Sequence, residues 1–479
     1  MEIKKRRFEQ FQDWIMGMYL NNDVAKNSNI KVLSRTFTFQ VTDACNLACT
    51  YCYQINKNKR RMSFETAKLA VDKLLSGEDG FGEYINPNNS PAIILDFIGG
   101  EPFLEIELID KIVDYFKLKT IELNHPWAKN YAISICSNGV LYNDIKVQKF
   151  LQKNKDVLSF NITVDGTKEL HDACRIFADG SPSYDLAHSA ALDWMKRGYE
   201  MGSKITIAPD NLKYFSKCML ALIEDGYHTI NANYVYEEGW TLEHAQEFYQ
   251  RCKEFIDIFH SKYDLANYEF SLFIETWAKP LSSKENTNWC GGTGLMLAMD
   301  PDGKLFPCIR YMESSIGNTQ KPLIIGDVFN GLMQKTCEKQ CVDCMGKITR
   351  RSQSTDQCFY CPIASGCAWC SAYNYQVFGT IDKRATYICE MHKARSLALV
   401  YFYNKYYKKN NIANVKDLWV PKQWAIPIIG EEEYNYLVEL TKSLGGYVNE
   451  NAIMVDIGDK TLDFHKQENY KNIQILKND

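Results

Sequence analysis

The alternation of hydrophobic and polar positions predicts a chain of strands and helices that follow one another. The segment 35–42 alternates with period two, and several later apolar runs have the length of buried strands. We predict six strands, at 35–42, 92–98, 131–136, 157–164, 203–208 and 228–235. Helices are predicted between them at 63–75, 104–116, 183–197 and 212–224, with Ser63 as a capping residue and Gly77 past the end of the first.

This order of elements predicts an α/β fold built from parallel βα units. Six units are too few to close an eight-stranded barrel, so we predict a partial (β/α)6 barrel of the TIM type. Active sites of such folds lie at the carboxyl ends of the strands. The residues that directly follow each predicted strand are therefore the first candidates for chemistry.

Composition narrows the class of protein. The 479 residues suggest two or three domains, and 46% apolar with 24% charged residues is typical of a soluble globular chain. A formal net charge of −4 argues against a nucleic-acid-binding surface. No apolar run approaches the ~18 residues of a membrane span, and the basic start lacks the apolar core of a signal peptide. We expect a cytoplasmic protein without a membrane or nucleic-acid partner.

Seventeen cysteines in a long chain without an export signal indicate metal binding rather than disulfides. Their distribution supports this, because three stand within 45–52 and ten within 290–389. The other four are scattered, and we interpret them as small buried or half-buried residues: Cys136, Cys174, Cys218 and Cys252.

Cys45, Cys49 and Cys52 follow the first predicted strand at spacings of four and three. Three thiolates on a short loop can bind three corners of a cubane iron–sulfur cluster and leave the fourth iron open for a substrate. The alternative, a structural zinc site, needs a fourth protein ligand. The spacing therefore favours a reactive cluster.

Polar residues follow the next three strands as well. Gly99-Gly100-Glu101-Pro102 comes after the second, and a carboxylate there could receive an amino group. Ser137-Asn138-Gly139 follows the third, and Thr163-Val164-Asp165-Gly166 ends the fourth. Arg175 could pair with a ligand carboxylate. We interpret His171 and Asp172 as capping or satisfied polar residues.

Together these residues resemble the motifs of the radical S-adenosylmethionine (SAM) superfamily over roughly 35–240. The resemblance implies that the three cysteines bind a [4Fe-4S] cluster and that Tyr51 is the aromatic residue of that motif. It implies SAM contacts from ten residues, which are Tyr51, Gly99, Gly100, Glu101, Pro102, Ser137, Asn138, Thr163, Asp165 and Arg175. SAM would chelate the open iron and yield a 5′-deoxyadenosyl radical that abstracts a hydrogen atom.

The carboxyl-terminal cysteines resemble the SPASM domain, which carries two auxiliary [4Fe-4S] clusters in peptide-modifying radical enzymes. Asp300 to Gly303 predicts a hairpin turn that lets the cysteines on either side converge. The resemblance implies Cys290, Cys308, Cys344 and Cys370 as ligands of the first auxiliary cluster. It implies Cys358, Cys361, Cys367 and Cys389 for the second.

Two details of this region stay open. The family spacing usually ends in Cys-x3-Cys, whereas here only two residues separate Cys367 and Cys370. The fourth ligand of the first auxiliary cluster could also be Cys337 or Cys341, or the cluster could be open. Zinc ribbons are the alternative for this region.

The resemblance implies a peptide maturase with three [4Fe-4S] clusters and SAM, which installs cross-links in a ribosomally made precursor. A cysteine thioether to carbon is the first expectation. Its partners would be a precursor peptide with a leader sequence and an electron donor such as flavodoxin or ferredoxin. An anaerobic sulfatase-maturing enzyme is the alternative, although such enzymes usually place an aspartate after the second auxiliary cysteine, where this chain has Ile309 and Arg310. A non-catalytic iron–sulfur electron carrier is the third hypothesis.

We divide the chain accordingly into five segments. They are an amino-terminal helical segment at 1–34, a partial barrel at 35–240, a helical linker at 241–285, a SPASM domain at 286–395, and a carboxyl-terminal helix with a small appendage at 396–479.

Overall fold

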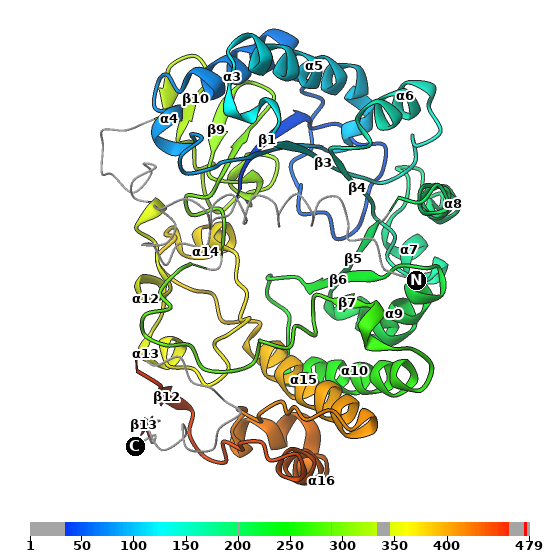
Figure 1. Ribbon diagram of the computed structural model, residues 1–479, viewed down its shortest axis with the longest axis vertical. Coiled ribbons are helices and arrows are strands. Elements are labelled where there is room, and N and C mark those ends of the chain that lie inside the picture. The colour runs from blue at the N-terminus through cyan, green and yellow to red at the C-terminus, as the bar shows by residue number, and fades with distance from the viewer. Residues whose placement is uncertain (1–33, 200, 289, 333–344, 459–473, 477–479) are drawn as a thin grey trace.

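A computed structural model describes residues 34–199, 201–288, 290–332, 345–458 and 474–476, so nearly all of the predicted 1–34 segment lies outside it. The larger sheet contains β1 (Arg35–Thr42), β2 (Ile93–Gly99), β3 (Tyr131–Ser137), β4 (Leu158–Ile162), β8 (Met296–Met299), β9 (Lys304–Phe306), β10 (Gly326–Asp327) and β11 (Gly331–Leu332). Its strand order is β11-β10-β9-β8-β1-β2-β3-β4 (Figure 1). Strands β1 to β4 are parallel, as predicted.

The remaining predicted strands form a second, smaller sheet. It contains β5 (Gly202–Ile207), β6 (Thr229–Tyr234) and β7 (Glu269–Phe270), all parallel. The prediction of an α/β fold with parallel strands is confirmed, but the six strands do not form one continuous sheet. Between β4 and β5 the Gly202 N–H donates to the side-chain Oδ1 of Asn161 at 3.1 Å, so a side chain bonds where a ladder would run.

Helices connect the parallel strands. They are α3 (Phe64–Ser76), α4 (Phe81–Tyr84), α5 (Ile106–Glu122), α6 (Ile145–Asn154), α7 (Lys168–Cys174), α8 (Tyr184–Lys196) and α9 (Phe215–Glu224), with 3-10 turns η1 (Pro102–Glu105), η2 (Pro126–Ala128) and η3 (Pro209–Tyr214). The predicted caps of α3 are present. The Thr66 N–H donates to Ser63 Oγ at 3.0 Å, and Gly77 ends the helix with φ of 73°.

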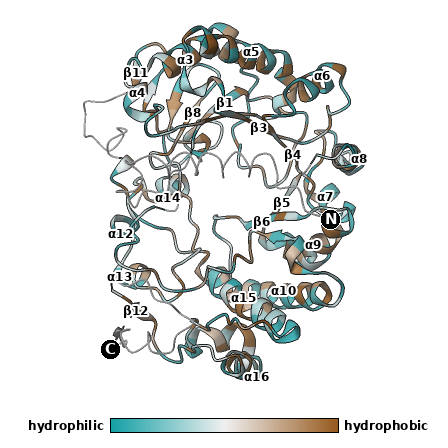
Figure 2. Ribbon diagram, viewed as in Figure 1, coloured by the Kyte–Doolittle hydropathy of each residue, from teal (hydrophilic) through white to brown (hydrophobic). Residues whose placement is uncertain are grey.

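One face of the larger sheet packs against helices. Figures 1 and 2 show α3, α5 and α6 over this face, each with polar and apolar residues on different sides. The rings of Phe39 in β1 and Phe97 in β2 stack 5.3 Å apart, and Val71, Ile112 and other apolar residues of α3 and α5 belong to the same core. Because burial of apolar area is the main stabilising term, these alternating positions fix which face of each strand points outward.

The cysteine-rich region continues the larger sheet. β8 pairs in parallel with β1 and turns back into β9 through the predicted hairpin at Asp300–Gly303, where Gly303 has φ of 84°. η5 (Ile309–Tyr311), α12 (Arg350–Gln353), α13 (Asp356–Phe359) and α14 (Ser371–Phe378) follow. The region predicted to begin a separate domain at 286 therefore covers the edge of β1, which would otherwise expose unpaired backbone groups.

The last helices pack on one another below the smaller sheet (Figure 1). They are α10 (Leu242–Lys262), α15 (Cys389–Asn410) and α16 (Lys422–Ser443), with η4 (Leu265–Asn267), β12 (Met454–Asp456) and β13 (Gln474–Leu476) nearby in sequence. Tyr401 of α15 donates to Asp257 of α10 at 2.6 Å. The segment 241–285, predicted as a helical linker, thus contains α10 and also the strand β7.

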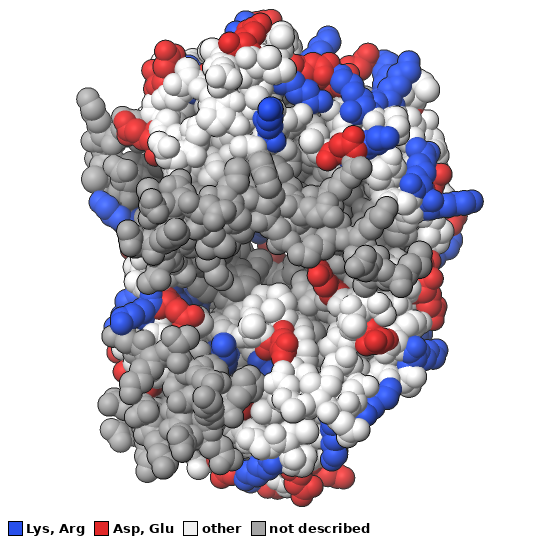
Figure 3. Space-filling view, in the orientation of Figure 1, with Lys and Arg blue, Asp and Glu red and all other residues white. Residues whose placement is uncertain are grey.

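Charges on the surface are mixed in sign. On the face in Figure 3 acidic and basic side chains lie side by side, and over α5 and α6 they form ion pairs such as Lys153 with Asp110 and Asp114 at 2.8 and 2.6 Å. Among the described helices, none is both long and apolar enough to cross a membrane.

Candidate functional site

The loop of Cys45, Cys49 and Cys52 leaves the carboxyl end of β1, and all three thiols are half-buried. Backbone bonds fasten this loop to the segment after α7. The N–H of Ala48 donates to the Ile176 carbonyl at 2.7 Å, and the N–H of Thr50 donates to the Cys174 carbonyl at 2.9 Å. The loop is therefore positioned by two parts of the fold that are more than a hundred residues apart in sequence.

Burial raises the pKa of the Cys45 and Cys49 thiols above their usual value, and a neighbouring cysteine adds to the rise in each case. A thiol must lose its proton to ligate iron, so binding of a cluster here releases protons. Cysteine thiolates are the donors that iron–sulfur clusters require.

The two glycines of the Gly99-Gly100-Glu101-Pro102 motif pack against this cysteine loop. The Gly100 N–H donates to the Thr42 carbonyl, and the Glu101 N–H donates to the Ala44 carbonyl, both at 2.9 Å. A Cβ on Gly100 would lie 2.2 Å from the Ala44 carbonyl oxygen. The backbone of the cysteine loop at Ala44 thus lies against Gly100, and this contact joins the end of β2 to the cysteine loop.

Glu101 is buried, and its carboxylate already has three donors. They are the Ser137 hydroxyl at 2.8 Å, the Asn138 N–H at 2.8 Å and the Phe103 N–H at 3.1 Å. Burial raises the pKa of Glu101, and the hydrogen bonds from Asn138 and Ser137 oppose that rise. Pro102 begins the 3-10 turn η1 and is buried. The carboxylate expected to receive an amino group therefore also ties β2 to β3.

Asn138 extends the same network to the cysteine loop. Its side-chain Nδ2 donates to Asn46 Oδ1 at 2.7 Å and lies 4.0 Å from Cys45 Sγ. Ser137 and Asn138 are both buried. The third strand end thus supports the first cysteine of the loop.

Tyr51, Asp165 and Arg175 form a buried polar cluster beside Cys49. The Tyr51 hydroxyl donates to Asp165 Oδ2, and Arg175 Nη1 donates to the Tyr51 oxygen at 2.8 Å. Burial raises the pKa of Asp165, and the positive charge of Arg175 opposes that rise. This cluster brings together three residues that the sequence predicted as SAM contacts.

Two polar atoms of this cluster have no partner among the described residues. They are Asp165 Oδ1 and Arg175 Nε, and both are buried. Unpaired buried polar atoms are costly, so native structures usually satisfy them, and a bound ligand is one way to do so. A ligand with hydroxyl and carboxylate groups such as SAM carries the complementary donors and acceptors.

Thr163 lies apart from that cluster. Its N–H donates to the Ser137 carbonyl at 3.0 Å, and its hydroxyl lies 3.4 Å from the Cys136 thiol. It faces the inner side of the larger sheet at the end of β4. The structure therefore joins Ser137 and Asn138 to Glu101 in one hydrogen-bond network, and Tyr51 links Asp165 with Arg175 in the other. Gly99, Gly100 and Pro102 flank Glu101 in the chain, and Thr163 bonds to Ser137 through its backbone. Contact of these ten residues with SAM stays a prediction.

His171 and Asp172 have the structural roles that we assigned to them. His171 is fully buried between the Asp165 N–H and the Ser183 hydroxyl, which lies 3.1 Å from its Nε2. Asp172 accepts from the N–H groups of Ser183 and Tyr184 at 3.1 and 2.9 Å, at the start of α8.

A second group of cysteines converges around the hairpin of β8 and β9. Burial raises the pKa of Cys308, and the neighbouring Cys290 and Cys370 thiols raise it further. A Cβ on Gly292 would lie 3.2 Å from Cys308 Sγ and 3.4 Å from Cys290 Sγ, so the backbone leaves space between these thiols. Cys344, with the alternatives Cys337 and Cys341, lies outside the described residues.

A third group consists of Cys358, Cys361, Cys367 and Cys389. Burial raises the pKa of Cys361, and the other three thiols add to that rise. Cys389 is the first residue of α15. No three His, Cys, Asp or Glu side chains of the described residues converge tightly enough for a single metal ion. A cubane has an iron behind each thiolate, so its ligands stand farther apart than those of one ion.

Of the four scattered cysteines, three are buried as predicted, but the prediction for Cys136 is wrong. Cys136 is exposed because its position in β3 points to the face opposite the helices. Tyr53, Asp96 and Arg310 gather near it, and none of them was a sequence candidate. The signal for Asp96 was a charged residue inside the apolar run 92–98.

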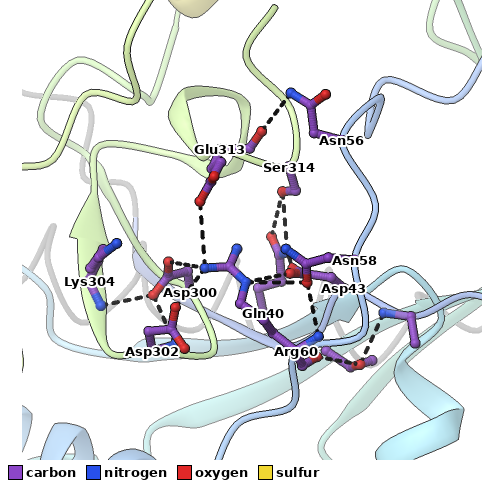
Figure 4. A network of polar contacts seen from close by, with 12 residues as sticks. Gln40, Asp43, Asn56, Asn58, Arg60, Asp300, Asp302, Lys304, Glu313 and Ser314 are labelled. Atoms are coloured by element: carbon purple, nitrogen blue, oxygen red, sulfur yellow. Dashed lines mark hydrogen bonds and ion pairs between the residues drawn. The ribbon is translucent and has the colours of Figure 1, made fainter.

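Hydrogen bonds and ion pairs of Arg60 also join the segment after the cysteine loop to the hairpin region (Figure 4). Arg60 Nε donates to the buried Asp43 at 2.7 Å, and its Nη1 donates to Asp302 at 2.7 Å and to Asp300 at 3.3 Å. Gln40 in β1 donates to Ser314 at 3.2 Å beside it. This network, which we call the Arg60 clasp, connects the first cysteine group with the turn between the ligands of the second.

A protein-family model described as "4Fe-4S single cluster domain" matches residues 34–181. The chain is 30% identical over 173 residues to the serine-type anaerobic sulfatase-maturating enzyme of Bacteroides thetaiotaomicron. This alignment covers 36% of this chain and 38% of that protein. It is 33% identical over 200 residues to an uncharacterised protein of Methanocaldococcus jannaschii, over 40% of this chain and 59% of that one. The chain thus spans less than two thirds of the length of both relatives.

A more extended similarity is to the radical SAM cyclopropyl synthase TigE of Paramaledivibacter caminithermalis, 22% identical over 378 residues that cover 74% of this chain and 71% of that enzyme. Among solved structures, native anSMEcpe with bound AdoMet matches with a TM-score of 0.56 at 17% identity, over 79% of this chain and 99% of that one. These findings confirm the predicted resemblance to radical SAM enzymes and to their fold.

Proposed function

We propose that this protein is a radical SAM maturase that cross-links a ribosomally made precursor peptide, most directly by joining a cysteine sulfur to a carbon atom. The observation that carries the proposal is the convergence of Cys45, Cys49 and Cys52 with the polar cluster of Tyr51, Asp165 and Arg175. Two further cysteine groups stand in the same chain. The similarity to TigE over most of its length supports a radical SAM enzyme.

The residues present fit the two cofactors. In the proposal the three loop cysteines hold a [4Fe-4S] cluster, and Asp165 Oδ1 and Arg175 Nε face SAM as its hydrogen-bond partners. Cys290, Cys308, Cys344 and Cys370 hold one auxiliary cluster, and Cys358, Cys361, Cys367 and Cys389 hold the other. SAM with the reduced cluster supplies a radical that abstracts hydrogen from carbon, while the protein positions the substrate and excludes water.

The chain's own residues determine how the site is built. The positive charge of Arg175 opposes the rise in the pKa of Asp165 that burial causes, and so favours the carboxylate form at the place where hydroxyl groups of a ligand would bind. Glu101 holds β2 and β3 at a fixed distance from the loop. An electron donor such as flavodoxin or ferredoxin is the proposed reductant, and a leader sequence on the precursor is the proposed means of recognition.

A second candidate is oxidation of a cysteine or serine to formylglycine. The similarity to the Bacteroides thetaiotaomicron sulfatase-maturating enzyme and the fold of anSMEcpe favour it. The residue after Cys308 distinguishes the two candidates, because this chain has Ile309 where such enzymes usually carry an aspartate. We therefore retain cross-linking as the first proposal.

Anaerobic co-expression with a cysteine-containing precursor encoded beside this gene tests the proposal. We expect a product lighter by two hydrogens per link, with one fewer thiol open to alkylation and no reaction with a hydrazide probe. A product that reacts with the hydrazide instead carries an aldehyde and supports the formylglycine candidate. An unmodified peptide after SAM has been cleaved would contradict both.

A further inference from the structure

The inner face of the larger sheet carries a row of polar side chains that the proposed cofactors do not use. Asp96 in β2 lies in register with Thr38 of β1 and Ser134 of β3. Its neighbours Leu95 and Phe97 are fully buried against the helices, so Asp96 points to the opposite, inner face.

Among the residues that the structure describes, the Asp96 carboxyl has hydroxyl groups as its hydrogen-bond donors. Thr38 Oγ1 donates to Asp96 Oδ2 at 3.0 Å, and Ser134 is its other hydrogen-bond partner. Within the described part of the chain no basic side chain forms an ion pair with it. A carboxylate in a half-buried place without a cation binds a proton more readily than one in water. Burial accordingly raises the pKa of Asp96.

Tyr53 places this carboxyl beside the first cysteine group. Tyr53 directly follows Cys52, and burial raises the pKa of its phenol. After burial, the charges of four neighbours affect the pKa of that phenol most, and they are those of Cys52, Arg310, Asp96 and Cys136. Side chains from the cysteine loop, β2, β3 and the hairpin region thus lie close enough to Tyr53 to shift the pKa of its phenol.

Arg310 connects Tyr53 with the second cysteine group. Its guanidinium lies 5.4 Å from the centre of the Tyr53 ring, and it donates to Glu237 at 2.7 Å. Among the neighbouring charges, that of the Cys370 thiol raises the pKa of Arg310 most. The contact of Tyr53 with Arg310 therefore joins the loop of Cys52 to the group that contains Cys370, and the Asp96 carboxyl is close enough to shift the pKa of Tyr53.

We propose that Asp96 is a catalytic residue that accepts the substrate's thiol proton during cross-linking. This inference rests on the proposed function. The S–H bond of the substrate cysteine breaks and its proton goes to Asp96, while a C–H hydrogen atom goes to the SAM-derived radical. The C–S bond forms, and the one remaining electron passes to the auxiliary iron–sulfur cluster of Cys290, Cys308 and Cys370.

The geometry also selects the substrate class. Among the described residues the Asp96 carboxyl has hydroxyl donors and no ion-pair partner, so it can accept a proton from an acidic group of a substrate. Arg310 lies 5.4 Å from the centre of the Tyr53 ring, and its positive charge would stabilise a developing thiolate beside that ring. A cysteine side chain of a peptide meets these conditions.

The test compares Asp96→Asn with Asp96→Glu and with the control Asp110→Asn. Asparagine keeps the size of aspartate and can hydrogen-bond to Thr38, whereas Asp110 is a surface residue of α5 paired with Lys153. The readouts are 5′-deoxyadenosine formed, cross-linked peptide formed and the dependence of cross-linking on pH, with iron content and circular dichroism as checks of folding.

We expect Asp96→Asn to release 5′-deoxyadenosine within about threefold of wild type but to form at least ~100-fold less cross-link, the usual contribution of a general base. In wild type the cross-linking rate should fall as the pH drops through the pKa of Asp96, because the base must be unprotonated. Asp96→Asn should lose this acid limb, Asp96→Glu should keep it at a shifted pH, and Asp110→Asn should behave as wild type.

Two results separate this inference from the proposed function. Equal cross-linking by wild type and Asp96→Asn, with the same acid limb, would overturn the role of Asp96 and leave the maturase proposal standing. A wild-type protein that cleaves SAM without altering any precursor would overturn both. Should Asp96→Asn lose iron, an unshifted acid limb in Asp96→Glu would overturn the role of Asp96.

Discussion

Single residues at the strand ends both resemble a SAM-binding motif and hold neighbouring parts of the site in place. Glu101 accepts hydrogen bonds from the Ser137 hydroxyl and the Asn138 N–H, both at 2.8 Å, and so joins β2 to β3. Gly100 lets the Ala44 carbonyl come so close that any side chain would collide with it. The residues that resemble a SAM motif thus also determine where the cysteine loop lies.

His171 gives a prediction about pH. Burial lowers the pKa of its imidazole to about 3, against an ordinary value of 6.5. The unfolded chain therefore takes up a proton at a higher pH than the folded one. The stabilisation from keeping this imidazole neutral is complete above pH 6.5 and is lost as the pH falls toward 3. We expect a loss of about 2 kcal/mol between pH 7 and pH 5 from this residue.

Urea unfolding of wild type and His171→Gln at both pH values measures this effect. Glutamine does not titrate, so the variant should lack about 2 kcal/mol of the wild-type decline, although it is less stable at pH 7. Other buried histidines, such as His260, contribute equally to both proteins and cancel. An identical decline in the two proteins would show that His171 is protonated at the same pH in both states.

At this scale the sequence predicted the residues that follow strands and missed those inside them. Cys45, Glu101 and Asp165 stand in recognisable motifs just after strands, and Arg175 follows the helix α7 that comes after β4. Asp96 stands within a strand, where only the register with neighbouring strands shows which face it occupies. Periodicity alone does not say whether the inner face meets solvent, substrate or more protein.

At the scale of elements, the Arg60 clasp joins the cysteine loop to the hairpin of β8 and β9 (Figure 4). Asp43 is fully buried, and Arg60 is its ion-pair partner at 2.7 Å. Removing the arginine leaves a buried carboxylate without its cation. We expect Arg60→Ala to lower the free energy of unfolding by about 2–3 kcal/mol, at the lower end because Arg60 is partly exposed.

The neighbouring Arg61→Ala is the matched control, since its side chain is 65% exposed and pairs with Glu105. An exposed ion pair contributes at most about 1 kcal/mol, so the control should change the free energy of unfolding little. Denaturant unfolding measures both variants. Equal effects of the two substitutions would mean that the clasp does not connect the elements.

The elements themselves were largely predictable. All six strands formed within a few residues of their predicted bounds because apolar runs and capping residues are local signals. The pairing of β8 with β1 was not predictable, because it joins segments about 260 residues apart and depends on which strand edge remains free. The break between β4 and β5 likewise depends on one side chain, Asn161, that bonds to the backbone of Gly202.

At the scale of the molecule, the cysteines named as candidate ligands stand in three groups along the described chain. The first lies on the loop after β1, the second around the hairpin, and the third before and at the start of α15. The cysteines that the SPASM resemblance assigns to each auxiliary cluster lie near one another where the structure describes them, since Cys290 and Cys370 raise the pKa of Cys308 while Cys358, Cys367 and Cys389 raise that of Cys361. Their role as cluster ligands stays a prediction. Spacing could not show that Arg310 contacts Tyr53 beside the first group, because that contact depends on how the hairpin packs on β1.

The central claim is that the loop cysteines and the cluster of Tyr51, Asp165 and Arg175 form a SAM-cleaving site. The most direct test is the amount of 5′-deoxyadenosine formed by the anaerobically reconstituted, reduced protein with SAM. We predict formation by wild type and a loss of at least ~100-fold in Cys45→Ala, while Cys252→Ala, a buried cysteine outside the three groups, keeps it. No 5′-deoxyadenosine from an iron-loaded wild type, or an undiminished amount from Cys45→Ala, would contradict the account.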